Sequence, residues 1–138
     1  MAQLPDWDEG SAGVLCVAGP HAIPISTAVR LAPDRIVFAL GGRREALARL
    51  RAEPAAAFCL LARGLAFTAH GQARVLSEAL DSVPSIVAVE LLVKRVQDHL
   101  ADGRTEMLSA PGWRWLEEQA AESDPEILAE VRRLGSAR

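Results

Sequence analysis

The chain has 138 residues, of which 50% are hydrophobic and 24% charged, and its formal net charge is −3 at pH 7. This composition is typical of one globular domain over residues 1–138; it excludes a disordered chain, and the negative charge argues against a nucleic-acid binder. No apolar run approaches the roughly 20 residues that cross a bilayer, and the acidic start lacks a signal-peptide pattern, so we expect a cytoplasmic protein without membrane contact.

The first third of the chain has the alternation of apolar and polar residues that is typical of β-strands. Turn signals at residues 19–20 and 33–34 divide it, which predicts an antiparallel meander of three strands at residues 13–18, 23–31 and 35–40. The period then changes: Ala46, Leu47 and Leu50 recur at helical spacing, which predicts a short helix over residues 43–52 that Pro54 ends.

Three further strands are predicted at residues 55–61, 65–76 and 86–96. Gly71, in the middle of a long strand, indicates a bulge or a sharp bend of the kind a small barrel needs to close. We therefore expect a mainly β protein of the α+β class, a six-stranded antiparallel barrel, closed or partly closed.

The C-terminal part of the chain is predicted to be helical. Trp113, Leu116 and Ala120 fall on one face of a first helix. Residues 123–126 have the pattern of a helix N-terminus with Pro125 at the first position, and Gly135 is predicted to end that last helix.

The junction between the third strand and the first helix is the most informative site candidate. Gly41 and Gly42 allow close approach of the backbone, a helix start offers unpaired amides, and Arg43 and Arg44 add bidentate donors for a phosphate. The alternative is a glycine turn followed by surface arginines. The lysine and hydroxyl of a Walker motif are absent.

Other polar residues give weaker signals. Ser26 and Thr27 lie in the second strand, where a hydroxyl facing outward could bond a phosphate or a ring carbonyl, or simply belong to the strand surface. The three histidines, His21, His70 and His99, have no metal-ligand spacing; we expect no metal site and assign them no role.

The cysteines and tryptophans each leave two interpretations open. Cys16 and Cys59 lie in apolar runs and are interpreted as buried small hydrophobes rather than metal ligands or a disulfide. Trp113 and Trp115 could line a pocket wall in an irregular segment, or anchor a core or a dimer interface.

Five stretches in this order resemble the pyridoxamine 5′-phosphate oxidase-like family of flavin-binding split barrels. They are residues 13–17, 20–25, 35–40, 47–54 and 67–75. The run that contains them, residues 13–75, spans about half the chain, and residues 86–96 are similar to the last barrel strand of the family more loosely.

The resemblance implies a homodimer that binds FMN, or the deazaflavin F420, in clefts between subunits. It implies cofactor contacts at Ser26, Thr27, Leu40, Gly41, Arg43 and Arg44, which include the anion site predicted at the junction of strand and helix. It implies an oxidoreductase acting on a small molecule, with the redox chemistry supplied by the cofactor and no catalytic side chain assigned.

The chain departs from the family pattern at two positions of that site. Leu40 stands where the family has a threonine, and Ala46 or a neighbour stands where it has a lysine. Arginine does not reproduce lysine geometry. Three alternatives therefore stay open: an F420-dependent reductase, a non-catalytic split-barrel dimer that binds flavin or haem, and an interaction module without a cofactor.

Overall fold

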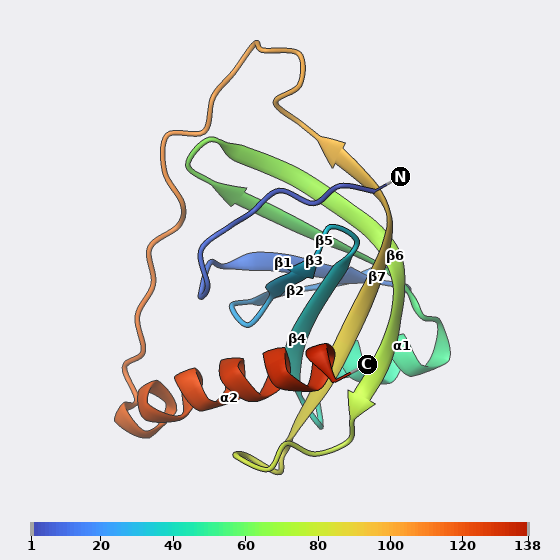
Figure 1. Cartoon of the computed structure of the whole chain (residues 1–138), viewed down its shortest axis with the longest axis vertical. Helices are drawn as coiled ribbons and strands as arrows, with labels where there is room; N and C mark the ends of the chain where they lie inside the picture. Colours follow the sequence, from blue (N-terminus) through green and yellow to red (C-terminus); the bar gives the residue numbers. More distant parts are fainter. Residues whose placement is uncertain (1, 138) are drawn as a thin grey trace.

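The chain folds around one antiparallel β-sheet, seen in a computed structural model that describes residues 2–137. Seven strands and two helices make up the fold (Figure 1). In chain order they are β1 (Gly13–Val17), β2 (His21–Ile25), β3 (Val29–Ala32), β4 (Arg35–Gly41), α1 (Glu45–Ala52), β5 (Ala55–Ala62), β6 (Leu65–Ser77), β7 (Ile86–Asp98) and α2 (Glu118–Ser136). The mainly β, α+β class is confirmed.

The sheet curls like a barrel but stays open. Its strand order is β2-β1-β5-β6-β7-β4-β3, so the two edge strands, β2 and β3, follow each other in the chain. Residues 26–28 connect one edge to the other without closing the sheet. The predicted count of six strands is therefore wrong, because the single strand expected over residues 23–31 is two strands at opposite edges.

Thr27 explains why that predicted strand divides. In the register of β3 with β4, Thr27 would lie opposite Ala39. Its hydroxyl instead donates to the Ala39 carbonyl oxygen (3.1 Å) and accepts from the Ala39 amide (3.0 Å). These two side-chain bonds occupy the Ala39 backbone groups that would otherwise pair with the backbone of an extended β3. The predicted pairings hold for the two halves, β1 with β2 and β3 with β4, but not as a continuous meander.

The concave side of the sheet holds the main core. Trp7, Phe58 and Phe67 pack together there, with ring centroids 5.4–6.3 Å apart. Helix α1 covers one end of this core with its predicted apolar face of Ala46, Leu47 and Leu50 (Figure 1). Burial of this face, more than helix propensity, stabilises a helix this short.

The bulge predicted at Gly71 is confirmed. The register of β6 with β7 shifts between His70 and Gly71. A Cβ on Gly71 would lie 2.0 Å from the Leu92 carbonyl oxygen, so only glycine fits this close approach. The bulge bends β6 and β7, the two longest strands, around the core.

Helix α2 packs on the convex side of the sheet, over β3 and β4 (Figure 1). Val131 and Gly135 are buried in this second core, with Val29 and Val37 of the sheet. Neither helix of residues 2–137 is long and apolar enough to cross a membrane.

The C-terminal boundaries differ from those predicted. The helix starts at Glu118, so Pro125 lies in its interior, and Gly135 lies within its last turn instead of ending it. The run Glu118–Glu122 consists of good helix formers, which extends the helix ahead of the proline. Trp113 and Leu116 precede α2, so the predicted first helix with these two residues on one face is wrong.

Candidate functional site

A cavity of about 490 Å³ lies at the open seam of the sheet, between β2, β4 and the N-terminal half of α2. Its size is within the range of small-molecule sites, roughly 300–1,000 Å³. Most of the lining is apolar: Ile23, Pro24, Ile25, Ala39, Leu40, Val83, Ile86, Trp115, Ala120 and Ile127. The polar lining residues are Ser26, Thr27, Arg44, Glu117, Gln119, Ser123 and Asp124.

The structure brings five of the six predicted site residues to this cavity and leaves one outside. Ser26 and Thr27 reach it from the link between the sheet edges, and Leu40 and Gly41 from the end of β4. Arg44 reaches it from the residue before α1. Arg43 is exposed and is not among the lining residues.

The two hydroxyls differ in what they can do for a ligand. That of Thr27 already donates and accepts a hydrogen bond with Ala39. Ser26 is half-buried, and no hydrogen bond within residues 2–137 engages its hydroxyl. Ser26 can therefore bond a ligand directly, while Thr27 shapes the wall.

The start of α1 is less open to an anion than its sequence predicts. The Gly42 amide donates to the Ser85 carbonyl oxygen (2.8 Å), and the Arg44 amide to that of Gly41 (3.0 Å). These two amides already have hydrogen-bond partners, so neither is available to bind an anion at this junction. The positive charge that remains is the Arg44 guanidinium, whose side chain passes near Gly41.

Glu45 adds a negative charge to the first turn of α1. Its carboxylate accepts a hydrogen bond from Arg49 (2.7 Å) and lies 3.5 Å from His21 Nδ1. The hydrogen bond from Arg49, then the charges of Arg49 and His21, lower the pKa of Glu45. This carboxylate stays ionised and would repel a phosphate placed directly on the helix start.

The cavity wall formed by α2 and the residue before it was not foreseen. Glu117 and Asp124 add two acidic residues to the lining on the α2 side, and Trp115 adds an aromatic one. Trp115 lies in an irregular segment and lines the cavity, as the pocket-wall alternative expected, whereas Trp113 is not among the lining residues. Trp113 stacks edge-to-face on it at 5.4 Å, and its Nε1 donates to the Gly10 carbonyl oxygen (2.7 Å).

None of the three histidines is among the residues that line the cavity. His70 Nε2 bonds Gln97 (2.7 Å) and His99 Nε2 bonds the Thr68 hydroxyl (2.8 Å), both at the far end of β6 and β7. Across residues 2–137, no three His, Cys, Asp or Glu side chains gather where they could hold a metal ion.

Cys16 and Cys59 are free thiols, half-buried rather than fully buried as predicted. Burial, and secondarily the nearby Cys59, raises the pKa of the Cys16 thiol. Cys16 is therefore a protonated thiol of low reactivity at neutral pH.

Comparison with known proteins identifies the fold. No protein-family model matches the chain, and no curated protein sequence matches it. A pyridoxamine 5′-phosphate oxidase-like protein of Lactobacillus delbrueckii matches 70% of this chain and 99% of its own, with TM-score 0.55 and 17% identity. An NADH:FAD oxidoreductase of Streptomyces globisporus matches 78% and 87%, with TM-score 0.54 and 14% identity.

An F420 reductase matches 68% of this chain and 98% of its own, with TM-score 0.54 and 12% identity. The chain thus has the split-barrel fold of pyridoxamine 5′-phosphate oxidase-like proteins. The resemblance expected from the sequence is confirmed at the level of the fold.

Proposed function

We propose that this chain binds FMN in the cavity at the seam of the sheet and acts as a flavin-dependent oxidoreductase on a small molecule. The observation that carries this proposal is the convergence of Ser26, Thr27, Leu40, Gly41 and Arg44 on one mostly apolar cavity. The likeness in fold to solved flavin and F420 proteins supports the general class.

The charges of the cavity suggest how FMN would be oriented. The phosphate would lie at the end with Arg44 and Ser26, because Glu117 and Asp124 on the opposite wall would repel it. The flat ring would then lie between the apolar residues of β2 and the indole of Trp115. Arg43 is not part of this proposal, since its side chain lies outside the cavity.

The protein would contribute binding and exclusion of water, while bound flavin supplies the acceptance and donation of electrons. Ser26 would hold the phosphate end by a hydrogen bond and Leu40 would shield the ring. No side chain of the cavity is assigned as a catalytic acid or base.

We further propose that two copies of the chain pair through the convex face of β2, β1 and β5. The side chains that point outward there are apolar: Val14, Cys16, Ala22, Pro24, Ala57, Cys59 and Leu61. Val14 and Leu61 are 39% and 44% exposed in the single chain. An exposed apolar sheet face of this kind is typical of a protein interface. Pro24 belongs both to this apolar outer face and to the cavity, so a second copy would border the ligand.

F420 is the alternative cofactor, because the solved F420 reductase and the solved NADH:FAD oxidoreductase match this fold with the same TM-score, 0.54. The other alternative is a split-barrel dimer that binds flavin or haem without turnover. The absorption spectrum of the purified protein tests these proposals. Oxidised-flavin bands, with one FMN released per chain on denaturation, would support the FMN proposal. A Soret band would instead indicate haem. A colourless protein that FMN does not saturate would refute the FMN proposal.

A further inference from the structure

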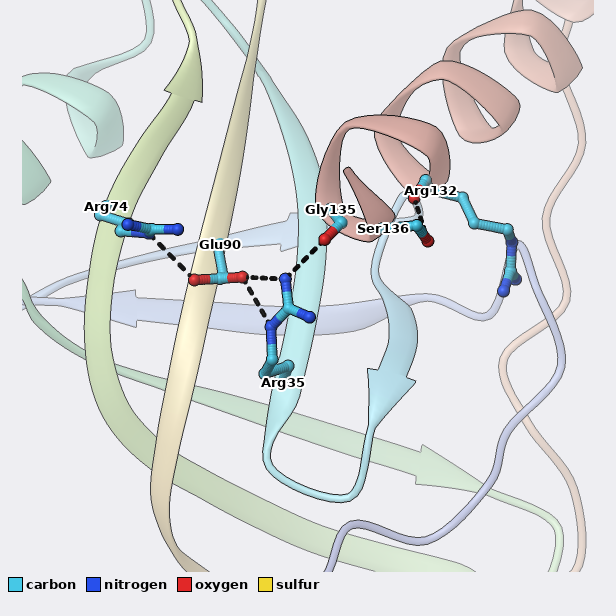
Figure 2. Close-up of polar contacts among 6 residues, drawn as sticks. All are labelled: Arg35, Arg74, Glu90, Arg132, Gly135 and Ser136. Carbon is cyan, nitrogen blue, oxygen red and sulfur yellow. Dashed lines mark hydrogen bonds and ion pairs between the residues drawn. The ribbon is translucent and has the colours of Figure 1, made fainter. Parts of the chain in front are cut away.

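A fully buried carboxylate lies beneath the C-terminal end of α2. Glu90, on β7, is 1% exposed. Its Oε1 accepts a hydrogen bond from Arg74 Nε (3.0 Å), and its Oε2 accepts from Arg35 Nε (2.7 Å) and Arg35 Nη2. Figure 2 shows Glu90 between the two arginines, with Arg74 on the side away from the helix. A buried carboxylate needs such partners, because burial of an unpaired charge is costly.

Arg35 connects this ion pair to α2. Its Nη2 also donates to the Gly135 carbonyl oxygen (2.7 Å), one of the last carbonyls of the helix (Figure 2). The helix is seated closely at this point, since a Cβ on Gly135 would lie 2.5 Å from Leu31 Cδ2 and 2.8 Å from Val37 Cγ1. The positive guanidinium also complements the negative end of the helix dipole.

A second attachment lies one turn and a half earlier in the helix. The Glu130 carboxylate accepts hydrogen bonds from the Asp81 amide (2.6 Å), the Ser82 amide (2.8 Å) and the Ser82 hydroxyl (2.7 Å). Desolvation works to raise the pKa of Glu130, but these bonds and the charge of Arg133 outweigh it and lower the pKa. Glu130 therefore fixes the middle of α2 to the loop between β6 and β7.

The N-terminal half of α2 has a different role: Gln119, Ala120, Ser123 and Asp124 line the cavity. The helix runs unbroken from Glu118 to Ser136. At about 1.5 Å per residue, Gly135 lies about 7 Å beyond Glu130 and Ala120 about 15 Å before it. If the helix tilts about Glu130, a displacement at Gly135 is therefore about doubled at the cavity wall.

We propose that Arg35 and Glu90 are positioning residues for the ligand cavity, because their contact with Gly135 sets the tilt of α2 and hence the place of its cavity wall. The effect on ligand binding rests on the proposed FMN function. The effect on the wall itself does not, since it follows from the contacts of α2 alone.

The test compares the same substitution at the two arginines of Glu90. In Arg35→Lys a positive charge stays near Glu90, but the planar fork that bonds both Glu90 and Gly135 is lost. Arg74→Lys is the matched control, because Arg74 bonds Glu90 on the side away from α2. Gly135→Ala displaces the same end of the helix by crowding Leu31 and Val37, and serves if Arg35→Lys fails to fold.

Two measurements are made on each variant: the Kd for FMN, and hydrogen exchange of residues 118–124 without ligand. We expect Arg35→Lys and Gly135→Ala to raise the Kd about three- to tenfold and to speed exchange over residues 118–124. Arg74→Lys should change neither by more than about twofold. Equal values in Arg35→Lys and Arg74→Lys for both measurements would overturn the proposal.

The two proposals fail in different ways. If the wild-type chain does not bind FMN, the proposed function fails, and hydrogen exchange alone decides the role of Arg35. Faster exchange over residues 118–124 in Arg35→Lys than in Arg74→Lys would then support the positioning role, and equal exchange would refute it.

Discussion

Arg43 and Arg44 are neighbours with the same charge, but only Arg44 lines the cavity, so replacing each with alanine separates a local contact from general electrostatics. A hydrogen bond to a charged group contributes about 1.5–3 kcal/mol, and an exposed ion pair only about 0.2–1 kcal/mol. Arg44 is exposed at its site, so we expect Arg44→Ala to weaken FMN binding by about 1–2 kcal/mol. This corresponds to about a five- to thirtyfold higher Kd.

The assay is titration of FMN, followed by flavin fluorescence at two salt concentrations. Arg43→Ala should change the Kd by no more than about twofold, and the salt dependence should be weaker in Arg44→Ala than in the wild type. We expect Arg44→Ala to leave the stability of α1 unchanged, because the Arg44 side chain makes no capping hydrogen bond to this helix, so a change in Kd reports on binding. Equal effects of the two substitutions, or an unchanged Kd in Arg44→Ala, would refute the placement of the phosphate.

Three further predictions concern the fold and the assembly. Gly71→Ala should destabilise the chain by about 3 kcal/mol in urea unfolding, the upper end of the usual range for overpacking, because the added Cβ meets the Leu92 carbonyl oxygen at 2.0 Å; an unchanged midpoint would contradict the close approach. The pKa of Glu130 is lower in the folded chain than its ordinary value of 4.5, so its carboxylate stabilises the fold above that pH and less so as the pH falls below it. Glu130→Gln should therefore flatten the acid branch of the stability profile, and an identical branch would count against this role. Leu61→Asp should convert a dimer into a monomer in sedimentation, whereas a monomeric wild type would remove the proposed interface.

Alternation and glycine spacing were enough to predict most of the sheet. The bulge at Gly71 could be predicted because a glycine inside a long strand usually marks a bulge or a close approach of the backbone. The break at Thr27 could not, since Thr27 continues the apolar alternation and only its side-chain bonds to Ala39, a residue distant in sequence, end the strand. Periodicity reports which face a residue takes, and it does not report which neighbour a strand pairs with.

The cavity lining that comes from the C-terminal part of the chain could not be predicted for a similar reason. Pro125 after Asp124 has the form of a helix N-terminus, but the helix formers from Glu118 onward continue through it. The carboxylates of Glu117 and Asp124 reach the cavity only because α2 folds back over the seam, where it meets β4 across about 80 residues of sequence. On the β2–β4 side, Gly41 and Arg44 could be proposed because the glycine pair marks the junction of strand and helix, and Ser26 because of its hydroxyl and the family resemblance.

The most direct measurement compares FMN with riboflavin, which has the same ring without the phosphate, by titration into the wild-type chain. The cavity with Arg44 and Ser26 at one end predicts saturation at one FMN per chain, and riboflavin binding at least about tenfold weaker, the loss of about one charge-assisted bond. Equal affinity for the two compounds would contradict the phosphate end of the site, and failure of both to bind would contradict the flavin function itself.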